Sequence, residues 1–393
     1  MQTSVQPSIA TGGEESRPPV VLQVLPALET GGVERTAVDI AVALVRAGWG
    51  AVVASSGGAM VHELERAGAQ HVQLPLASKN PLVMRGNIRR LERLIRERGV
   101  DIVHARSRAP AWSAKAASER AGVHFVTTFH GTYNHGNALK RRYNTVMLQG
   151  ERVIANSAFI AEHVRSVYQF GDERLVTIAR GVDVHKFDPA RVSAERMIQL
   201  SQQWRLEDGL PVILLPGRLT RWKGQMVLVE ALAMLGRTDV VALLVGDDQG
   251  RKAYRQELID LIQKRGVERI VRIVDHCRDM PAAYMLADVV VSASTDPEAF
   301  GRVTAEAQAM GRPVIATDHG GSRETVLHLE TGWLVPPGDA GALAGALDAA
   351  LALDPATREA VAVRAREHIL EHFTVEQMCD ATLDVYAEIV GQG

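Results

Sequence analysis

Short apolar runs alternate with amphipathic stretches along most of the chain. In the first half, the apolar runs are Val20–Leu25, Ala51–Ala54, Val72–Leu74, Asp101–His104, Val123–Thr128 and Arg152–Ala155. Helical patterns fill the intervals between them, the first from about Val33 to Ala47. Strands buried on both faces are apolar throughout, and strands that alternate with helices form parallel sheets. The first half therefore predicts a doubly wound α/β domain with helices on both faces of its sheet.

The same pattern restarts after an interruption. The alternation stops at Arg180–Asp183 and Phe187–Pro189, which indicates a segment crossing between two units. It resumes with apolar runs at Val212–Leu215, Val240–Val245, Arg269–Ile273, Val289–Ser292, Pro313–Ala316 and Trp333–Val335, and then with helical patterns at Ala340–Leu353 and about Val375–Ile389. We therefore predict two Rossmann-like doubly wound domains that face each other across a cleft and bind ligands beyond the carboxyl ends of their strands.

Composition supports a two-domain globular protein. The 393 residues exceed one ordinary α/β core, and 46% hydrophobic with 23% charged residues is typical of soluble proteins. A net charge of -2 argues against a nucleic-acid binder. Cys277 and Cys379 lie far apart, which favours reduced thiols over a metal or disulfide pair. Without a visible signal peptide or membrane span, we expect a cytoplasmic protein, with residues 1–17 as a disordered tail.

Two acids, Glu298 and Glu306, frame the strongest chemical signal. The segment follows an apolar run and opens a helix near Gly301, so Glu298 lies in a loop and Glu306 in the early helix. Amides around Phe300, Gly301 and Arg302 would be unpaired donors at a positive helix end, able to hold sugar hydroxyls or phosphate oxygens. Glu306 could accept from two ribose hydroxyls. The spacing alone fits a solvated helix glutamate behind an N-terminal acid equally well.

Two further loops are compatible with phosphate. Arg218 and Lys223 lie after the strand Val212–Leu215, where two cations could stabilise a departing diphosphate without a metal ion. Taken alone, the two residues would be better explained as surface charges on a loop. Gly31 and Gly32 follow the first strand and would let the backbone approach a phosphate in front of a helix dipole. A plain turn is equally compatible, and a NAD site is not supported because three spaced glycines are lacking.

Other polar residues at strand ends have a structural interpretation as well as a catalytic or metal-binding one. His130 ends a predicted strand, where catalytic groups gather in such folds, but a lone histidine is more often a structural hydrogen-bonding residue. His104 has the same position and the same alternative. Asp247 and Asp248 follow another strand, and we interpret them as helix-capping acids rather than a metal pair.

Taken together, these segments closely resemble family 4 of the glycosyltransferases, retaining enzymes with the GT-B fold. The resemblance extends from about Val20 to Val390 and is most specific in Glu298–Glu306. Further matches are Ala309–Ala316, Gly320–Glu324, Asn156–Ser157, Arg180–Asp183, Ala287–Val289 and Phe373–Thr374. It implies an acceptor-side domain at 18–190, a donor domain at 191–374 and a C-terminal helix, 375–393, that packs back on the first domain.

The resemblance also implies a donor site. Its catalytic residues would be His130, Glu298, Arg218 and Lys223. Its donor-binding residues would be Arg218, Lys223 and Glu298 together with Gly31, Gly32, Cys277, Phe300, Gly301, Arg302, Val303 and Glu306. Arg218 and Lys223 would bind the diphosphate and Glu306 the ribose, while Glu298 and neighbouring amides would hold the donor sugar. Gly32 would approach the phosphates from the opposing domain, and His130 would lie beside the transferred sugar.

The implied reaction is sugar transfer from a nucleotide-diphosphate sugar to a saccharide or lipid-linked acceptor, without metal or cofactor. No residue is an evident covalent nucleophile, so we expect a front-face displacement with retention, in which the departing phosphate takes the acceptor's proton. Cell-envelope polysaccharide or lipopolysaccharide assembly is the implied setting. The nucleobase stays open because Asp275 stands where many members carry glycine. A nucleotide-sugar epimerase and a non-catalytic nucleotide-sugar-binding protein remain alternatives.

A basic amphipathic helix bears on the acceptor side. Arginines interleave with apolar residues between Arg85 and Arg98, and Lys140–Arg142 forms a second basic cluster after His130. A solvated polar face is the interpretation we favour for the helix. The functional alternative is peripheral contact with an anionic membrane surface, or with a phosphorylated acceptor at the second cluster.

Overall fold

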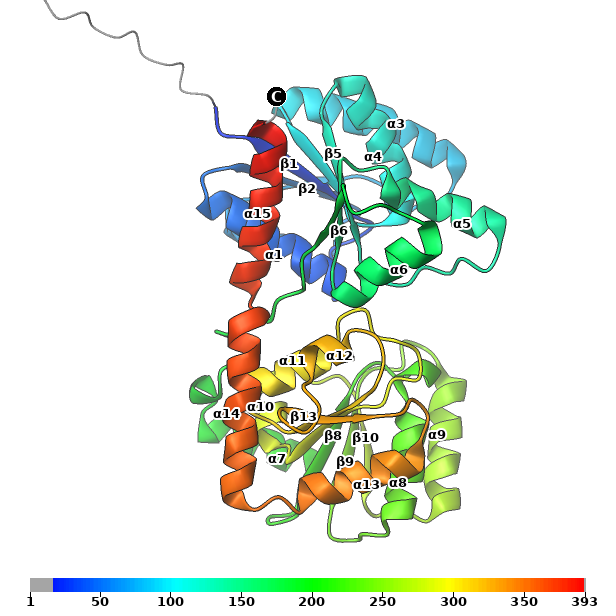
Figure 1. The fold of residues 1–393 in the computed structure, drawn as a ribbon, viewed down its shortest axis with the longest axis vertical. Helices are drawn as coiled ribbons and strands as arrows, with labels where there is room; N and C mark the ends of the chain where they lie inside the picture. Colours follow the sequence, from blue (N-terminus) through cyan, green and yellow to red (C-terminus); the bar gives the residue numbers. More distant parts are fainter. Residues whose placement is uncertain (1–16, 392–393) are drawn as a thin grey trace, which may run out of the picture.

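A computed structural model of the protein describes residues 17–391 (Figure 1). Two sheets lie one above the other, and the last two helices run along the same side of both. The predicted disordered tail lies outside the described residues except for Arg17. The guanidinium of Arg17 donates to both carboxylate oxygens of Asp101, at 3.0 and 2.7 Å.

The first sheet has seven parallel strands in the order β3-β2-β1-β4-β5-β6-β7. The strands are β1 Val20–Val24, β2 Gly50–Ser55, β3 Gln70–Gln73, β4 Ile102–Ala105, β5 His124–Phe129, β6 Arg152–Ala155 and β7 Leu175–Thr177. Its helices are α1 Gly32–Arg46, α2 Val61–Arg66, α3 Pro81–Arg98, α4 Arg108–Ala121, α5 Ala138–Asn144 and α6 Ala158–Tyr168, with the short η1 Thr145–Leu148.

The second sheet has six parallel strands in the order β10-β9-β8-β11-β12-β13. They are β8 Val212–Pro216, β9 Val241–Val245, β10 Val271–Val274, β11 Val289–Ser292, β12 Val314–Thr317 and β13 Gly332–Val335. The remaining helices are η2 Pro189–Arg191, α7 Ala194–Trp204, η3 Arg221–Lys223, α8 Gln225–Leu235, α9 Lys252–Arg265, α10 Met280–Leu286, α11 Arg302–Ala309, α12 Ser322–Thr325, α13 Ala340–Leu351, α14 Pro355–His372 and α15 Val375–Gly391. In both sheets, the strand order reverses beside the first strand, which confirms the predicted doubly wound architecture.

Alternate residues of the central strands enter different cores. In β1, Leu22 and Val24 pack on one face of the sheet, whereas Val21 packs on the other with Ile40 of α1. All four side chains are buried. Because successive strand residues point to opposite faces, a strand that is covered on both sides must be apolar throughout. This is why the sheet strands appear in the sequence as unbroken apolar runs.

The chain crosses between the two sheets twice, and the two crossings lie side by side. Val182 forms a parallel bridge with Thr374, with bonds from Val182 N to Phe373 O (2.8 Å) and from Val375 N to Val182 O (3.0 Å). Gly181 permits this approach, because a Cβ atom there would lie 2.2 Å from the Thr374 carbonyl oxygen. The helix α15 then returns along α1 and buries its apolar face in the first domain's core.

Candidate functional site

The loops at the carboxyl ends of both sets of strands meet between the sheets. Ser157, after β6, donates to the carbonyl oxygen of Ala299, which lies after β11. Glu324 of α12 accepts from the amides of Ala158 (2.8 Å) and Phe159 (2.7 Å) at the start of α6. A carboxylate from one domain thus satisfies free amides at a helix N-terminus of the other. These contacts hold the two sets of strand ends against each other.

Lys223 and Glu298 lie in direct contact. The ammonium group of Lys223 donates to Glu298 Oε1, which also accepts from the hydroxyl of Ser294 at 2.7 Å. The side chains of Lys223 and Glu298 are only 14% and 15% exposed, so this is a largely desolvated ion pair. Lys223 Nζ also lies 4.5 Å from the centroid of the Trp222 ring. The family resemblance places Lys223 at the donor diphosphate and Glu298 at the donor sugar. In the structure the two side chains form an ion pair.

Two glycines hold the Glu298 loop in place. A Cβ atom at Gly320 would lie 2.4 Å from the carbonyl oxygen of Glu298, and one at Gly321 would lie 2.4 Å from the Cα atom of Phe300. The amide of Gly321 donates to the Glu298 carbonyl at 2.8 Å. Backbone therefore packs directly on backbone, which explains why glycines occupy this segment of the family-like motif.

The predicted ribose residue, Glu306, already has two donors. Its carboxylate accepts from the hydroxyl of Tyr284 at 3.0 Å and from Arg302 Nη2 at 2.6 Å. The neighbouring Glu306 charge raises the pKa of Arg302, and burial raises the pKa of Tyr284 well above its usual value. A carboxylate offers about four lone-pair sites, so ribose hydroxyls could join these donors.

The helix α11 begins at Arg302, as the sequence predicts. Gly301 is its N-cap at φ 89°, and within the described chain no side chain caps its first turn. Phe300 is buried against Phe373, with ring centroids 5.6 Å apart, so only its backbone can face a ligand. Val303 packs partly buried on the same core. The backbone donors at this end point to anion or hydroxyl binding.

Two other predicted donor contacts differ in exposure. Arg218 is exposed, and its guanidinium has no hydrogen-bond or ion-pair partner among residues 17–391, while its carbonyl accepts from Gln225. Cys277 is buried in the core, and burial raises the pKa of its thiol. Its neighbour Asp275 is exposed and pairs with Arg255 at 2.8 Å. The Cys277 side chain is therefore closed to a nucleobase, whereas the backbone of this loop and the exposed Asp275 carboxylate are open to one.

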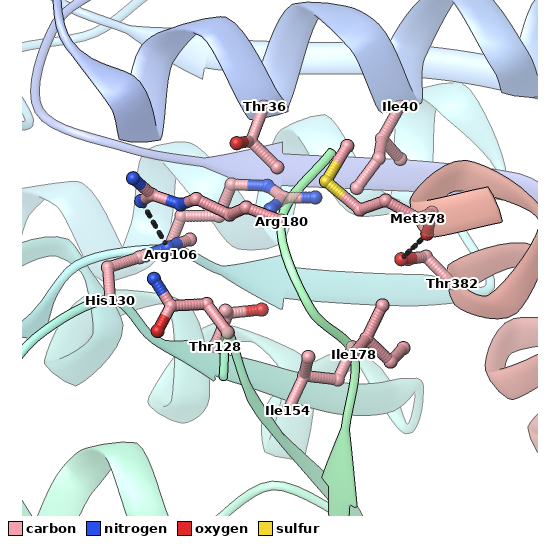
Figure 2. Close-up of a pocket in the computed structure, with 11 residues that line it drawn as sticks. Thr36, Ile40, Arg106, Thr128, His130, Ile154, Ile178, Arg180, Met378 and Thr382 are labelled. Carbon is pink, nitrogen blue, oxygen red and sulfur yellow. Dashed lines mark hydrogen bonds between the residues drawn. The ribbon is translucent and has the colours of Figure 1, made fainter. Parts of the chain in front are cut away.

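His130 lies opposite, at the end of β5. Its Nδ1 atom accepts from Arg180 Nη2 at 3.0 Å, and its Nε2 atom is buried without a hydrogen-bond partner in the described part of the protein (Figure 2). A guanidinium can only donate, so Nδ1 carries no proton and Nε2 carries it. Burial, together with Arg180 and Arg106, holds the pKa of His130 well below its usual value. His130 is therefore a neutral imidazole with a free N–H donor.

His104 is a structural residue. It lies fully buried between the hydroxyls of Tyr386 on α15 and Thr128 on β5, the latter at 2.7 Å. Burial holds its pKa well below the usual value. These contacts fit the structural role considered for this strand-end histidine. His104 connects α15 to the first sheet.

Asp247 and Asp248 hold a turn. Their carboxylates accept from the amides of Gln249 and Gly250, the second at 2.7 Å. Among residues 17–391, no group of three or more His, Cys, Asp or Glu side chains has the arrangement of a metal site.

Two arginines that the sequence reasoning missed lie beside His130. Arg106, 1% exposed, follows β4, and Arg180 lies on the first crossing segment. Both line a cavity of about 20 Å³, together with the polar side chains of Thr36, Thr128, His130 and Asn156 (Figure 2). A signal for Arg106 was its place directly after an apolar strand, where a large cation is unusual. Arg180 was noted only as part of a family-like motif.

Gly32 lies against the same cluster. A Cβ atom at Gly32 would lie 2.5 Å from Arg180 Nη1 and 3.5 Å from Arg302 Cδ in the other domain. The structure therefore brings the predicted Gly32 loop and His130 of one domain together with Arg302 of the other. Glu34, in the first turn of α1, lies close by, and its charge raises the pKa of Arg180 against the larger effect of burial.

Comparison with known proteins covers both domains. The family model described as Glycosyltransferase Family 4 matches residues 30–186, and that described as Glycosyl transferases group 1 matches residues 197–368. The D-inositol 3-phosphate glycosyltransferase of Jonesia denitrificans is 32% identical over 305 residues, which cover 73% of this chain and 71% of the relative.

Two solved structures resemble the whole chain. The crystal structure of a glycosyltransferase from Rickettsia africae is 37% identical, covers 96% of this chain and 100% of that chain, and has a TM-score of 0.89. Anabaena HepE in complex with UDP-glucose is 25% identical, covers 94% of this chain and 99% of that chain, and has a TM-score of 0.81.

Proposed function

The chain belongs to glycosyltransferase family 4, and from this membership we propose that it transfers a sugar from a nucleotide-diphosphate sugar to an acceptor hydroxyl with retention of configuration. It is a glycosyltransferase with the GT-B fold that the sequence predicted. The observation that carries the proposal is the position of the charged residues. Lys223, Glu298 and Glu306 lie at the carboxyl ends of the strands of one domain. Gly32 and His130 lie on the facing side of the other domain.

The donor site follows from these charges. Arg218 has no partner in residues 17–391, and Lys223, which has three N–H donors, can keep its bond to Glu298 while it contacts a phosphate oxygen. Ribose hydroxyls join the two donors already on Glu306. The complex of HepE with UDP-glucose supports a nucleotide sugar as the donor.

The proposed reaction is a front-face displacement. The bond between the anomeric carbon and the phosphate oxygen breaks, and its electron pair stays on the phosphate. The acceptor oxygen forms the new bond on the same face, and its proton goes to the departing phosphate oxygen. Arg218 and Lys223 stabilise the charge of the leaving group, and the Nε2–H of His130 donates to a hydroxyl of the transferred sugar.

The two cations occupy the role that a divalent ion plays in other transferases, so we propose that no metal or other cofactor is required. Turnover in excess EDTA is expected to equal turnover without it. Activity that EDTA abolishes and Mg²⁺ or Mn²⁺ restores would contradict this part of the proposal.

The proposed function is tested with a panel of nucleotide sugars. We expect one of UDP-, GDP- or ADP-sugars to raise the melting temperature, and chromatography with an acceptor panel to show the free nucleoside diphosphate and a glycosylated product. Appearance of an epimerised nucleotide sugar would favour the epimerase alternative. Binding without turnover across all acceptors would favour a non-catalytic binding protein.

For the acceptor we propose a saccharide or lipid-linked molecule used in cell-envelope polysaccharide or lipopolysaccharide synthesis in the cytoplasm. A second candidate, a phosphorylated polyol, is favoured by the relatives named D-inositol 3-phosphate glycosyltransferases. Assays with inositol 3-phosphate, free inositol and lipid-linked saccharides separate the two.

Peripheral membrane contact is part of the proposal. Arg85, Arg89 and Arg93 form an exposed stripe on α3 without ion-pair partners in the described chain, and Leu82 on α3 and Leu139 on α5 are 80% and 79% exposed. None of the described helices is both long and apolar enough to span a bilayer. Basic residues beside exposed leucines suit an anionic lipid surface. Failure to float with anionic vesicles would contradict this contact.

A further inference from the structure

Arg180 lies where the two domains and the N-terminus of α1 converge. Its Nη2 atom donates to His130 Nδ1 at 3.0 Å, and its Nη1 atom lies over Gly32. With the amide of Asn156 oriented to match its neighbours, Asn156 Oδ1 accepts from Arg180 Nε at 3.2 Å. Arg302 of the other domain borders the same space over Gly32. Three segments distant in sequence therefore meet here, with the Arg180 guanidinium and the Cδ atom of Arg302 both lying against Gly32.

This space has an excess of positive charge. The partners of Arg180 are the neutral His130 and Asn156, and Arg106 donates to the neutral Gln23. Arg302 pairs with a carboxylate, that of Glu306. Burial and repulsion by Arg302 and Arg106 lower the pKa of Arg180 to about 10. The Glu34 charge also acts on Arg180, but the two side chains form no ion pair among the described residues. A largely desolvated cation without an ion-pair partner is costly, and an anionic ligand removes much of that cost.

Unsatisfied donors point the same way. Within the described chain, Arg106 Nη2 and His130 Nε2 are buried and have no hydrogen-bond partner, and both residues line the cavity beside Arg180 (Figure 2). Native proteins rarely leave buried donors unpaired, and such groups mark a site for a ligand or an ordered water. The fifteen-residue helix α1 also directs the positive end of its dipole at Gly32.

We propose that Arg180 and Arg302, one from each domain, form an anion-binding site over Gly32 that takes a phosphate of the donor, in addition to Arg218 and Lys223. This inference rests on the proposed function, because that function supplies the phosphate. Arg180 has a second role in the proposal: its bond to Nδ1 sets the tautomer of His130, so that the buried Nε2 atom carries the hydrogen and is free to donate. Closing the domains on the donor would then bring cations from both sides to the leaving group.

The test is the substitution Arg180→Gln, with Arg46→Gln as a matched control. Arg46 is exposed in the last turn of α1, at the opposite end of that helix from Gly32, so the control removes an equal charge away from the site. Isothermal titration is carried out with UDP, GDP and ADP, each beside its own nucleoside. We expect R180Q to weaken binding of the nucleoside diphosphate about 10- to 100-fold while nucleoside binding changes less than about twofold. R46Q is expected to match the wild type.

Two further measurements keep the result interpretable. R180K keeps the positive charge but lacks the planar guanidinium group. We expect its affinity for the nucleoside diphosphate to lie between those of the wild type and R180Q. Circular dichroism and the melting temperature establish that each variant is folded. The inference is overturned if R180Q binds the diphosphate as tightly as the wild type, if the nucleoside is weakened equally, or if only the acceptor KM rises. A wild-type protein that binds none of the three nucleotides overturns the proposed function itself.

Discussion

At the scale of single residues, the contact between Lys223 and Glu298 changes how the donor site is understood. The resemblance assigns each to a different part of the donor, yet the two side chains are in direct contact with each other. Lys223 is thereby held in one position beside Trp222 rather than sampling its many rotamers. A cation held in place in advance stabilises a leaving group without further reorganisation, which is the main source of electrostatic catalysis.

The Lys223–Glu298 pair predicts a non-additive effect on stability. Because the pair is largely desolvated, K223A and E298A each leave one buried charge without its partner, and each is expected to lower the free energy of unfolding by roughly 2–3 kcal/mol. The double variant K223A/E298A is expected to lose less than the sum. Urea denaturation of the four proteins measures this. Strict additivity would mean that the pair contributes no coupling.

His130 predicts how stability depends on pH. Its pKa is well below 6.5 in the folded protein and near 6.5 in the unfolded chain, so the unfolded chain binds the additional proton. Stability therefore falls as pH drops below about 6.5, by about 1.4 kcal/mol per pH unit for this group. His104 contributes in the same direction. Substitution of His130 by Asn removes the contribution of His130 alone.

We expect the loss of unfolding free energy between pH 7.5 and 5.5 to be about 1.4 kcal/mol smaller for H130N than for the wild type. The measurement is urea denaturation at both pH values. H62N, at the exposed His62, is the matched substitution of the same residue type. An H130N profile parallel to that of the wild type would show that His130 does not change its pKa on folding.

At the scale of elements, the hydrophobic pattern predicts the strands of both sheet interiors and does not predict β7, α7 or α14. β7 has three residues at the sheet edge, of which only Leu175 is buried. α14 buries Ala365, His368 and Ile369 out of eighteen residues, so its apolar face is too narrow to produce a helical period. A hydrophobic period records which side chains are buried, and β7 and α14 form with few buried side chains.

The start of α6 carries the contact between domains and gives a prediction of its own. E324A removes a carboxylate that accepts two amides at this helix N-terminus, and we expect a loss of about 1 kcal/mol of unfolding free energy. Amide hydrogen exchange at Ala158 and Phe159 should accelerate. The neighbouring R323Q, which disrupts an exposed pair with Asp318, is the control and should leave this exchange unchanged. Equal exchange in E324A and R323Q would contradict this role.

At the scale of the whole molecule, α15 completes the core of the first domain. Met378, Cys379, Val385, Tyr386 and Ile389 are buried with residues of β1 and α1, and Tyr386 bonds to His104 across 282 positions of sequence. The first domain thus depends on a helix that the chain makes last. Its core is complete only after the second domain has been synthesised.

Truncation tests this dependence. A chain ending at Phe373 exposes the apolar surface that α15 covers, and we expect it to aggregate or to melt at least about 10 °C below the full chain. The milder Y386F keeps the packing and removes the hydroxyl that contacts His104 and Arg106, at a cost of about 1–2 kcal/mol. Circular dichroism melts of the three proteins provide the comparison. A truncated chain that melts with the full one would show that α15 is dispensable.

The sequence by itself determined the alternation of strands and helices, the two doubly wound domains and the loops after β1, β8 and β11, because each depends on neighbours within a few positions. Only the tertiary structure decided that Lys223 meets Glu298, that Arg106 is buried, and that Arg180 of one domain faces Arg302 of the other across Gly32. Long-range pairing of charges leaves no periodic trace in a sequence. An arginine on a loop has the same appearance whether it faces water or a cleft, and only the fold determines which charges are desolvated together.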